Sequence, residues 1–503
     1  MMLKRMIPIR NAEEIVAELK NFKNIVANER IGNIHVGLLD EVDDVEAIGI
    51  FTDGSNSVSK RRSAGVAVFS VSSLAFKLSR SENIFLEKYL LTPDKCFLIL
   101  IPRFYIGTRA NNIMKAFEYL CTLYMIDKIK NANFAVIDGS YISTLLSARW
   151  GIEHLYRDFH STFSTYYESR SNIDTDYVRE SFISVCNYVG NIIYDILSKK
   201  IFTSSMNPRD IALNFFEKYV DIIDYTYSTV MDRFDIPEIC RIPFMNYLVM
   251  FFETNFMVFS LLHLLEKARE KQVFLLWLNK EPDSRILTKT LRHGIFRMFT
   301  DAFVLDFSLE NNEYLFHTGL PPIEPSSLYV KESDPRSLSE SSHVLVPYIA
   351  DVVYGMYGAY DIIYIKYSDY VIQYTYPRTL FDSKTKKGKS MAHLALKYIK
   401  LLGYMSPLGY PIPMVQAHST TIVRGRLADI IADKFVEMLG DKSPTSELVK
   451  NLIGKSEENL LGFRMDYYAH RKVFHVLNFF IFIFLIVCLL FIGAFNVIKL
   501  VRV

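Results

Sequence analysis

The sequence predicts an α/β fold in which a mixed β-sheet is flanked by helices. Three segments rich in β-branched and aromatic residues, at 47–54, 64–76 and 96–106, are typical of strands. They are followed by an amphipathic helical pattern over 111–130. A short, continuously apolar run at 134–138 comes next, as expected of a central strand covered on both faces. Strands followed by a helix and a buried strand indicate an α/β domain with a mixed sheet.

The other predicted elements surround this block. Residues 12–30 form a helix with Ile15, Leu19 and Phe22 on one face. The first two strands form an antiparallel pair, joined by the polar and basic loop 55–63. The remaining expected elements are a helical insertion at about 145–270, a strand at 273–279, an exposed loop at 320–341, a hairpin at 361–377, and helices at 389–403 and 422–440.

Composition bounds the class of protein. The chain has 503 residues, of which 50% are hydrophobic and 14% aromatic, so a large buried core is possible and global disorder is excluded. Lys and Arg number 57 against 55 Asp and Glu, which argues against a wholly basic nucleic-acid binder. The five cysteines form no CxxC pair, a pattern typical of proteins in a reducing compartment. It argues against a zinc site built from cysteines and against a disulfide framework.

Two apolar stretches bear on membranes. Residues 473–498 carry no formal charge, and about 20 apolar residues suffice for a helix to cross the hydrocarbon core. We therefore expect a domain at 1–440, a polar stalk at 441–472 and a single transmembrane helix at 473–498. Basic residues flank this helix on both sides and do not decide its orientation; we expect the bulk of the chain in the cytoplasm.

The second apolar stretch spans 244–272. Asn246, Glu253, Asn255 and His263 interrupt it, and it ends in charged residues. These polar residues favour a long helix buried in the protein over a membrane span.

The tripeptide Asp-Gly-Ser follows two of the predicted strands, after 47–52 and after 134–137. Asp53 and Asp138 would therefore stand at strand ends, where side chains emerge into the ligand crevice of an open α/β sheet. Glycine allows the sharp turn there. If the two strands are neighbours, the carboxylates converge into a hard-oxygen site that suits Mg²⁺ or Mn²⁺. An ordinary Asx-turn at each copy is the alternative.

Further candidate ligands lie in two other segments. Glu118 belongs to the helix that leads into the second Asp-Gly-Ser strand and follows Phe117, so it either reaches the same point or lies on the surface. The segment 409–426 contains Tyr410 and His418, and Pro411 and Pro413 predict an extended, stiffened chain that leads into a helix. His418 would ligate a metal as neutral imidazole, or be one of the chain's structural or solvated histidines.

Basic residues follow the first of these strands. Lys60, Arg61 and Arg62 come shortly after Asp53 in the loop 55–63. They would hold the backbone phosphates of a nucleic-acid strand, or form a solvated turn.

Five stretches, taken in order, resemble the NurA family, the archaeal and bacterial DNA-end-processing nucleases that work with the HerA translocase. They cover most of residues 45–440. The stretches are FTDGSNSVSKRRSAGVAVFSV (51–71), AFEYLCTLYMIDKIKNANFAVIDGSYI (116–142), EKAREKQVFLLWLNKEPDSRIL (266–287), FTDAFVL (299–305) and GYPIPMVQAH (409–418).

The resemblance implies an RNase H-like core and a nuclease site with two divalent ions, Mn²⁺ or Mg²⁺. It implies that Asp53, Glu118 and Asp138 are the carboxylate ligands, with His418 as a further ligand or a phosphate contact. Tyr410 would help to position the DNA or the nucleophile. The implied phosphate contacts are Lys280, Ser284 and Arg285. It also implies a homodimer, a HerA-like hexameric ATPase as partner, and 5′→3′ exonuclease and single-strand endonuclease activity.

Two features depart from the family. The chain ends in a predicted membrane helix, and its section at about 145–270 is longer and more aromatic than the family pattern requires. A non-catalytic scaffold that docks a HerA-like ATPase at the membrane is therefore an alternative function. A membrane-tethered hydrolase of RNA or of a nucleotide is another, because one fold hosts several substrates.

Overall fold

The structure is a computed structural model. It describes residues 12–28, 33–62, 64–92, 97–100, 105–151, 153, 157, 207–212, 215, 238–280, 284–290, 296–325, 351–367, 370–381, 390–406, 410–423, 426–438 and 450–451. The chain divides into two compact units. The first comprises Met1–Ser59 and Gly65–Ile431, and the second comprises Lys60–Ala64 and Ala432–Val503.

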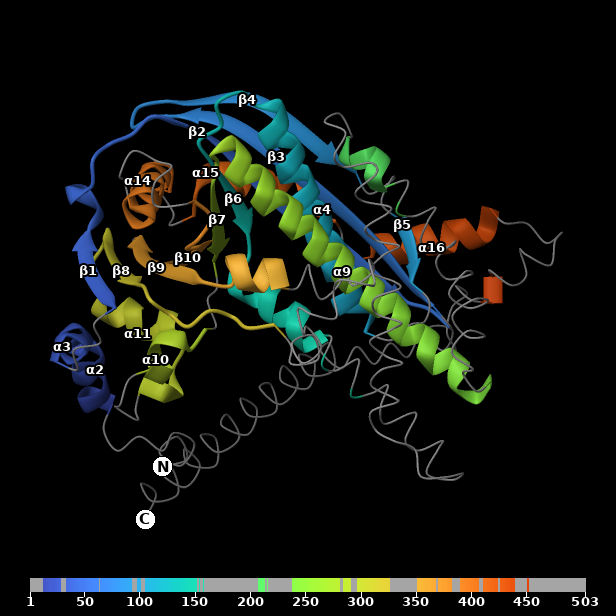
Figure 1. Ribbon diagram of the computed structural model, residues 1–503, viewed down its shortest axis with the longest axis horizontal. Coiled ribbons are helices and arrows are strands. Elements are labelled where there is room, and N and C mark those ends of the chain that lie inside the picture. Colours follow the sequence, from blue (N-terminus) through green and yellow to red (C-terminus); the bar gives the residue numbers. More distant parts are fainter. Residues whose placement is uncertain are drawn as a thin grey trace, which may run out of the picture. The chain divides into compact units, whose positions relative to one another are not determined.

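The described strands form one ten-stranded sheet, ordered β1-β8-β9-β10-β7-β6-β2-β3-β4, with β5 paired to β3 (Figure 1). The strands are β1 (Ile34–Leu38), β2 (Ala47–Lys60), β3 (Gly65–Leu78), β4 (Asn83–Leu91), β5 (Phe97–Leu100), β6 (Phe134–Asp138), β7 (Phe274–Asn279), β8 (Glu313–His317), β9 (Tyr360–Tyr367) and β10 (Tyr370–Pro377). β6 runs parallel to both β2 and β7, whereas β9 and β10 form an antiparallel hairpin. This confirms the predicted mixed α/β sheet and the predicted hairpin.

Helices flank the sheet. They are α2 (Ala12–Lys20), α3 (Phe22–Asn28), α4 (Ile106–Lys128), α9 (Glu238–Lys271), α10 (Ile286–Thr290), α11 (Asp301–Ser308), α14 (Met391–Gly403), α15 (Ile412–Thr421) and α16 (Leu427–Met438). Three short helical turns are η1 (Leu39–Glu41), η4 (Phe296–Met298) and the π-helical η5 (Asp351–Met356). The helix predicted at 12–30 is thus two helices, α2 and α3.

The two faces of the sheet are covered by different helices. Thr52 of β2 is hydrogen-bonded to Thr122 of α4, at 2.9 Å between the two hydroxyl oxygens. The adjacent Phe51 packs instead on Phe134, whose ring stacks on Tyr398 of α14 at 4.6 Å between centroids. Because successive strand residues face opposite sides, α4 covers one face of the sheet and α14 the other.

The long apolar helix predicted at 244–272 is confirmed as a buried helix, α9, which lies beside α4 (Figure 1). Within the described ranges, Val249–Lys271 is the single helix long and apolar enough to cross a membrane, and 89% of its most apolar window is buried inside the protein. Glu253 at its middle is fully buried and pairs with Arg109 of α4 through two contacts of 2.7 Å.

β2 is longer than predicted. The sequence predicted a strand end at Asp53 and a loop at 55–63, but β2 continues through Asp-Gly-Ser to Lys60. Ser57 and Ser59 are buried, and their hydroxyls bond the main chain of Ala428 and the carboxylate of Asp429. These tertiary contacts stabilise the strand conformation of a segment whose residue types favour a loop.

The segment with Tyr410 and His418 also differs from the prediction. It is not extended, because α15 begins at Ile412, directly after Pro411. Pro413 lies in the first helical turn, where the main-chain N–H would have no partner within the helix, so a proline is tolerated. His418 consequently lies in the last turn of α15 and not near the start of a helix.

Several predicted segments fall outside the described residues. They are the polar stalk and the transmembrane helix, apart from residues 450 and 451, and most of the helical insertion at about 145–270. β1, β4 and β8 were not predicted.

Candidate active site

Asp53 and Asp138 lie on neighbouring parallel strands. β2 and β6 pair in register as far as Thr52 and Ile137, the residues that directly precede the two aspartates. Gly139 follows Asp138 with φ of +99°, a conformation that glycine adopts readily, and ends the strand as predicted. Asp53 is 1% exposed. Burial raises the pKa of Asp53, and the nearby charge of Asp138 raises it further. The hydrogen bond and charge of His418 lower this pKa and so oppose the shift.

Glu118 reaches β2 from the face that α4 covers. Its side chain is fully buried, and among the residues that the structure describes its Oε1 has no hydrogen-bond partner. Gly54 makes room for it: a Cβ at Gly54 would lie 2.7 Å from Glu118 Oε1 and 3.0 Å from Met114 Cγ. Asp53 points to the opposite face, so the glutamate and the aspartate approach the strand from its two sides.

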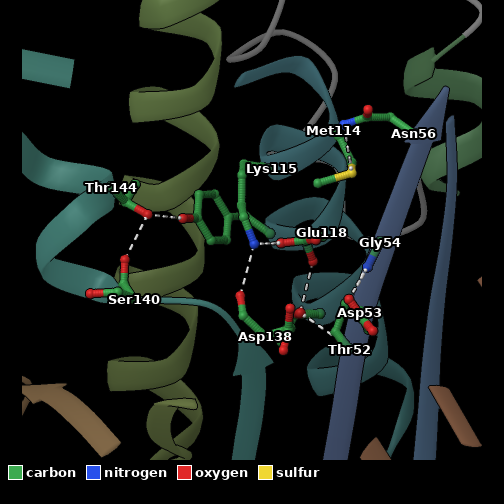
Figure 2. Close-up of polar contacts among 12 residues, drawn as sticks. Thr52, Asp53, Gly54, Asn56, Met114, Lys115, Glu118, Asp138, Ser140 and Thr144 are labelled. Carbon is green, nitrogen blue, oxygen red and sulfur yellow. Dashed lines mark hydrogen bonds and ion pairs between the residues drawn. The ribbon is translucent and has the colours of Figure 1, made fainter. Parts of the chain in front are cut away.

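Lys115 lies one helical turn before Glu118 on α4. Its Nζ is 2.6 Å from Glu118 Oε2 and 2.8 Å from the main-chain oxygen of Asp138, as Figure 2 shows. A Cβ at Gly139 would lie 3.1 Å from this ammonium, so the glycine leaves space for it. Burial alone would lower the pKa of Lys115, but the charges of Glu118, Tyr119 and Asp138 raise it overall.

The three carboxylates influence one another. Burial raises the pKa of Glu118 to about 8; Lys115 opposes this shift, while the charges of Asp53 and Asp138 add to it. Mutual repulsion of this kind is typical of carboxylates gathered around a place for a cation, although buried structural networks produce it too.

Tyr410 and His418 each contact one of the aspartates. The Tyr410 hydroxyl donates to Asp138 Oδ1 at 3.0 Å. Burial and then the charges of Asp138 and Asp53 raise the pKa of Tyr410, so the phenol stays protonated. His418 Nδ1 is hydrogen-bonded to Asp53 Oδ2 at 2.7 Å, and the side chain is 46% exposed. The structure thus links Tyr410 to Asp138 and His418 to Asp53, while Glu118 contacts β2 from the other face at Gly54.

Lys280 lies at the edge of this group. It directly follows β7, and its Nζ is 3.9 Å from Asp138 Oδ1 and 5.7 Å from the centre of the Tyr410 ring. Its side chain is 41% exposed, so it can contact both the site and a ligand from solvent.

Ser284 and Arg285 are placed differently. The Ser284 hydroxyl donates to Asp301 Oδ2 at 2.9 Å, while Arg285 is exposed. Asp301 also accepts from the main-chain N–H groups of Leu287 and Thr288, and so fixes the start of α10. Ser284 is therefore engaged in a buried network rather than turned toward a ligand.

Lys60, Arg61 and Arg62 belong to the second unit. Arg61 is 1% exposed, and its Nη1 is 2.7 Å from Asp433 Oδ1, so it stabilises that unit internally. Lys60 and Arg62 are exposed.

The donor set suits a hard divalent cation. Carboxylate oxygens are the ligands that Mg²⁺ and Mn²⁺ prefer, and within the described ranges Glu118 Oε1 is a buried carboxylate oxygen without a hydrogen-bond partner. The set is not preassembled, however: across the ranges the structure describes, no three His, Cys, Asp or Glu side chains surround one point closely enough to hold an ion.

Sequence reasoning missed Lys115 and Gly54. A lysine three positions before a glutamate on a helix is a frequent surface pair, so its spacing gave no reason to place it in the site. Gly54 was read only as part of a turn, whereas it lies within β2 and provides space for Glu118.

The chain is similar to known proteins in its fold and not detectably in its sequence. No family model matches the chain, and no curated protein is significantly similar to it. Among solved structures, the NurA nuclease from Sulfolobus solfataricus is 14% identical, with 87% of this chain and 100% of that chain covered and a TM-score of 0.42. A second NurA structure is 13% identical, with 89% and 99% covered and a TM-score of 0.44.

A third solved structure, NurA bound to dAMP and manganese, is 14% identical, with 87% of this chain and 98% of that chain covered and a TM-score of 0.39. All three carry the name of the family that the sequence motifs resemble. Because each TM-score lies below 0.5, we base the function on the side chains of this chain.

Proposed function

We propose that this protein is a divalent-metal-dependent nuclease that hydrolyses phosphodiester bonds in DNA. The observation that carries the proposal is the side-by-side placement of Asp53 and Asp138 after the paired residues of β2 and β6, with Glu118 of α4 buried against Gly54. Among the described residues, Glu118 Oε1 has no hydrogen-bond partner. Leaving a buried carboxylate oxygen without a partner costs about 1–3 kcal/mol or more, so a fold that keeps one has a use for it.

The three carboxylates would hold Mn²⁺ or Mg²⁺. When bound, such an ion stabilises the negative charge that builds up on phosphate oxygens during hydrolysis. Glu118 would contribute Oε1, and Asp53 and Asp138 would contribute the remaining carboxylate oxygens. Binding has to draw these groups together, because they are not preassembled.

The neighbouring side chains have separate tasks. Tyr410 stays protonated and donates a hydrogen bond to Asp138, which would orient that carboxylate. Asp53 orients the imidazole of His418, whose exposure allows it to hold or move a proton at the edge of the site. Lys280 supplies a positive charge beside Asp138 for a phosphate that does not react.

The cellular setting is proposed from the sequence. The uncharged run at 473–498 would anchor the enzyme in a membrane with its nuclease domain in the cytoplasm. The NurA-like motifs support end processing of DNA with a HerA-like hexameric ATPase, a homodimeric assembly, and 5′→3′ exonuclease and single-strand endonuclease activities.

The test is cleavage of labelled single- and double-stranded DNA by the full-length protein with Mn²⁺ or Mg²⁺. We expect Asp53→Asn, Glu118→Gln and Asp138→Asn each to lose at least about 100-fold in rate, because each removes a charged ligand. Asp40→Asn is the matched control, since Asp40 is an exposed aspartate of η1. Cleavage that survives the changes at Asp53 and Asp138 would refute the proposal.

A non-catalytic scaffold is the second candidate, and the lack of a preassembled three-ligand group in the described residues favours it. Such a scaffold would dock a HerA-like ATPase at the membrane. A Mn²⁺ titration separates the two functions: a protein that binds no Mn²⁺ and cleaves no DNA, but associates with the ATPase, is the scaffold.

A further inference from the structure

We propose that Gln373 is a positioning residue for Lys280: it fixes the chain on both sides of this lysine, so that the ammonium is presented to a DNA phosphate beside Asp138. The inference deepens the proposed nuclease function and rests on it, because a phosphate contact is the task proposed for Lys280. It does not depend on where a metal ion binds.

The side-chain amide of Gln373 joins two points of the chain. Gln373 is 1% exposed and lies on β10, between Tyr364 of β9 and Asn279 of β7, which are its partners in register (Figure 1). Its Oε1 accepts from the Asn279 amide at 3.2 Å. Its Nε2 donates to the hydroxyls of Ser284 and Tyr364, each at 3.2 Å. Gln373 therefore holds the last residue of β7 and a residue five positions after it.

Lys280 lies between these two points. It directly follows Asn279 and precedes Ser284 by four positions. Its Nζ is 3.9 Å from Asp138 Oδ1, and its side chain is 41% exposed. Because lysine has a flexible four-carbon stem, the main chain that carries it determines where the ammonium can reach. A main chain that is already fixed reduces the ordering cost when a phosphate binds.

Asp301 sets the direction of the hydrogen bonds around Gln373. It is fully buried, and its Oδ2 accepts from the hydroxyls of Ser284 at 2.9 Å and Tyr364 at 2.7 Å. Burial raises the pKa of Tyr364, and the charge of Asp301 raises it further, so the phenol keeps the proton that it donates.

The orientation of the Gln373 amide follows from these two hydroxyls. Each hydroxyl has a single proton and gives it to Asp301, so each can only accept from Gln373. The Gln373 Nε2 must therefore face Ser284 and Tyr364, which turns Oε1 toward Asn279. A fully satisfied buried network of this kind fixes one arrangement of the chain.

The test is the binding of labelled single-stranded DNA to the full-length protein, measured by fluorescence anisotropy in chelator over a series of salt concentrations. Each lysine–phosphate contact with a single strand contributes about 0.7 to the slope of log affinity against log salt. We expect Lys280→Gln to lower the magnitude of this slope by about that amount. Lys280→Gln and Gln373→Met should each weaken binding by about 3-fold or more.

The double variant separates positioning from a merely structural role. If Gln373 acts through Lys280, the protein with Lys280→Gln and Gln373→Met together should bind DNA no more weakly than Lys280→Gln alone. Asn255→Leu is the matched control, because it also removes a buried amide, one that donates to the Phe251 carbonyl within α9, and it should bind as the wild type.

Three results would overturn the inference: unchanged binding in a folded Gln373→Met protein, losses that add in the double variant, or unchanged binding in Lys280→Gln. If Gln373→Met does not fold, Tyr364→Phe takes its place in the same cycle, since it removes one acceptor of the Gln373 amide and keeps the ring.

DNA cleavage with Mn²⁺ is measured in parallel. Cleavage by a protein in which the losses add rejects the inference and keeps the nuclease. Losses that do not add, in a protein that cleaves no DNA, reject the nuclease and keep the positioning role. A protein that neither binds nor cleaves DNA rejects both.

Discussion

His418 Nδ1 is hydrogen-bonded to Asp53 Oδ2 at 2.7 Å, although 365 positions separate the two residues in the chain. The contact joins α15 to β2 and fixes which ring nitrogen faces the aspartate, so the other nitrogen is directed away from it.

The first prediction concerns this pair. His418→Asn should lower the DNA cleavage rate by about 100-fold or more, the contribution typical of a positioned acid or base. Single-turnover cleavage at saturating Mn²⁺ is the measurement. His35→Asn is the control, because His35 is an exposed histidine of β1. A loss that affects only the KM for DNA would assign His418 to binding instead.

Gly54 should not tolerate a side chain. In Gly54→Ala the new Cβ would lie 2.7 Å from Glu118 Oε1, so the carboxylate has to shift from its present position. We expect weaker Mn²⁺ binding and at least about 10-fold slower cleavage, with little change in circular dichroism. Gly107→Ala on α4 is the matched control. It meets nothing within 4 Å and lies in the first turn of α4, so it should change stability by no more than about 0.5 kcal/mol.

The Tyr410 hydroxyl should contribute separately from its ring. Tyr410→Phe removes the hydrogen bond to Asp138 and keeps the ring beside Lys280. A hydrogen bond to a charged group contributes about 1.5–3 kcal/mol, so cleavage should slow by roughly 10- to 100-fold. Tyr370→Phe serves as the control, because Tyr370 is 61% exposed. An unchanged rate in Tyr410→Phe would mean that Asp138 needs no orienting donor.

Glu118 should make the metal-free protein less stable as pH rises. Burial raises the pKa of Glu118 from 4.5 to about 8, so the folded state binds a proton that the unfolded state has lost between these values. The free energy of unfolding therefore gains a contribution that is present below about pH 4.5 and disappears as pH rises through about 8. Thermal unfolding in chelator across this range should show a steeper decline for the wild type than for Glu118→Gln. Equal slopes would contradict the shift.

The same proton should compete with the metal. Mn²⁺ affinity should rise as pH increases toward about 8, since the Glu118 carboxylate has to be ionised to act as a ligand. Glu118→Gln should bind Mn²⁺ more weakly and lose this part of the pH dependence.

The buried pair of Arg109 and Glu253 should govern stability rather than chemistry. Removing one partner, in Arg109→Met or Glu253→Gln, leaves a buried charge or polar group uncompensated and should cost about 3–5 kcal/mol. The double replacement by Met and Leu should recover much of this loss. Chemical denaturation provides the measurement. Lys77→Met is the control: it breaks an exposed pair with Glu46 and should cost about 1 kcal/mol or less.

The fold was predictable where local patterns decide it. The run at 134–138 is a strand that ends at Asp138, because a buried apolar run followed by Asp-Gly allows little else. The hairpin of β9 and β10 was equally readable. In contrast, β2 continues past Asp53 because Ser57 and Ser59 find partners at the start of α16, hundreds of positions away, and no local pattern shows such partners.

The sequence indicated which acidic residues to consider for the site, but not which side chains and main-chain atoms surround them. Residue type and order pointed to Asp53, Glu118 and Asp138. The two aspartates follow paired residues of β2 and β6, whereas Glu118 contacts β2 at Gly54 from the opposite face. The helical form of the segment with His418 was hidden by Pro411 and Pro413, which read as extended chain but lie at a helix start, where proline is allowed. Lys115 could not be found, because its role depends on the main chain of Asp138.

Glu253 has a consequence for the synthesis of the chain. The segment around it is apolar enough to cross a bilayer, so during translation it competes for insertion into a membrane. An acidic side chain within such a segment opposes insertion into a bilayer. Arg109 precedes Glu253 in the chain and is already synthesised when the helix emerges. We therefore expect Glu253 to disfavour insertion of the new helix into lipid and its ion pair with Arg109 to favour packing against α4.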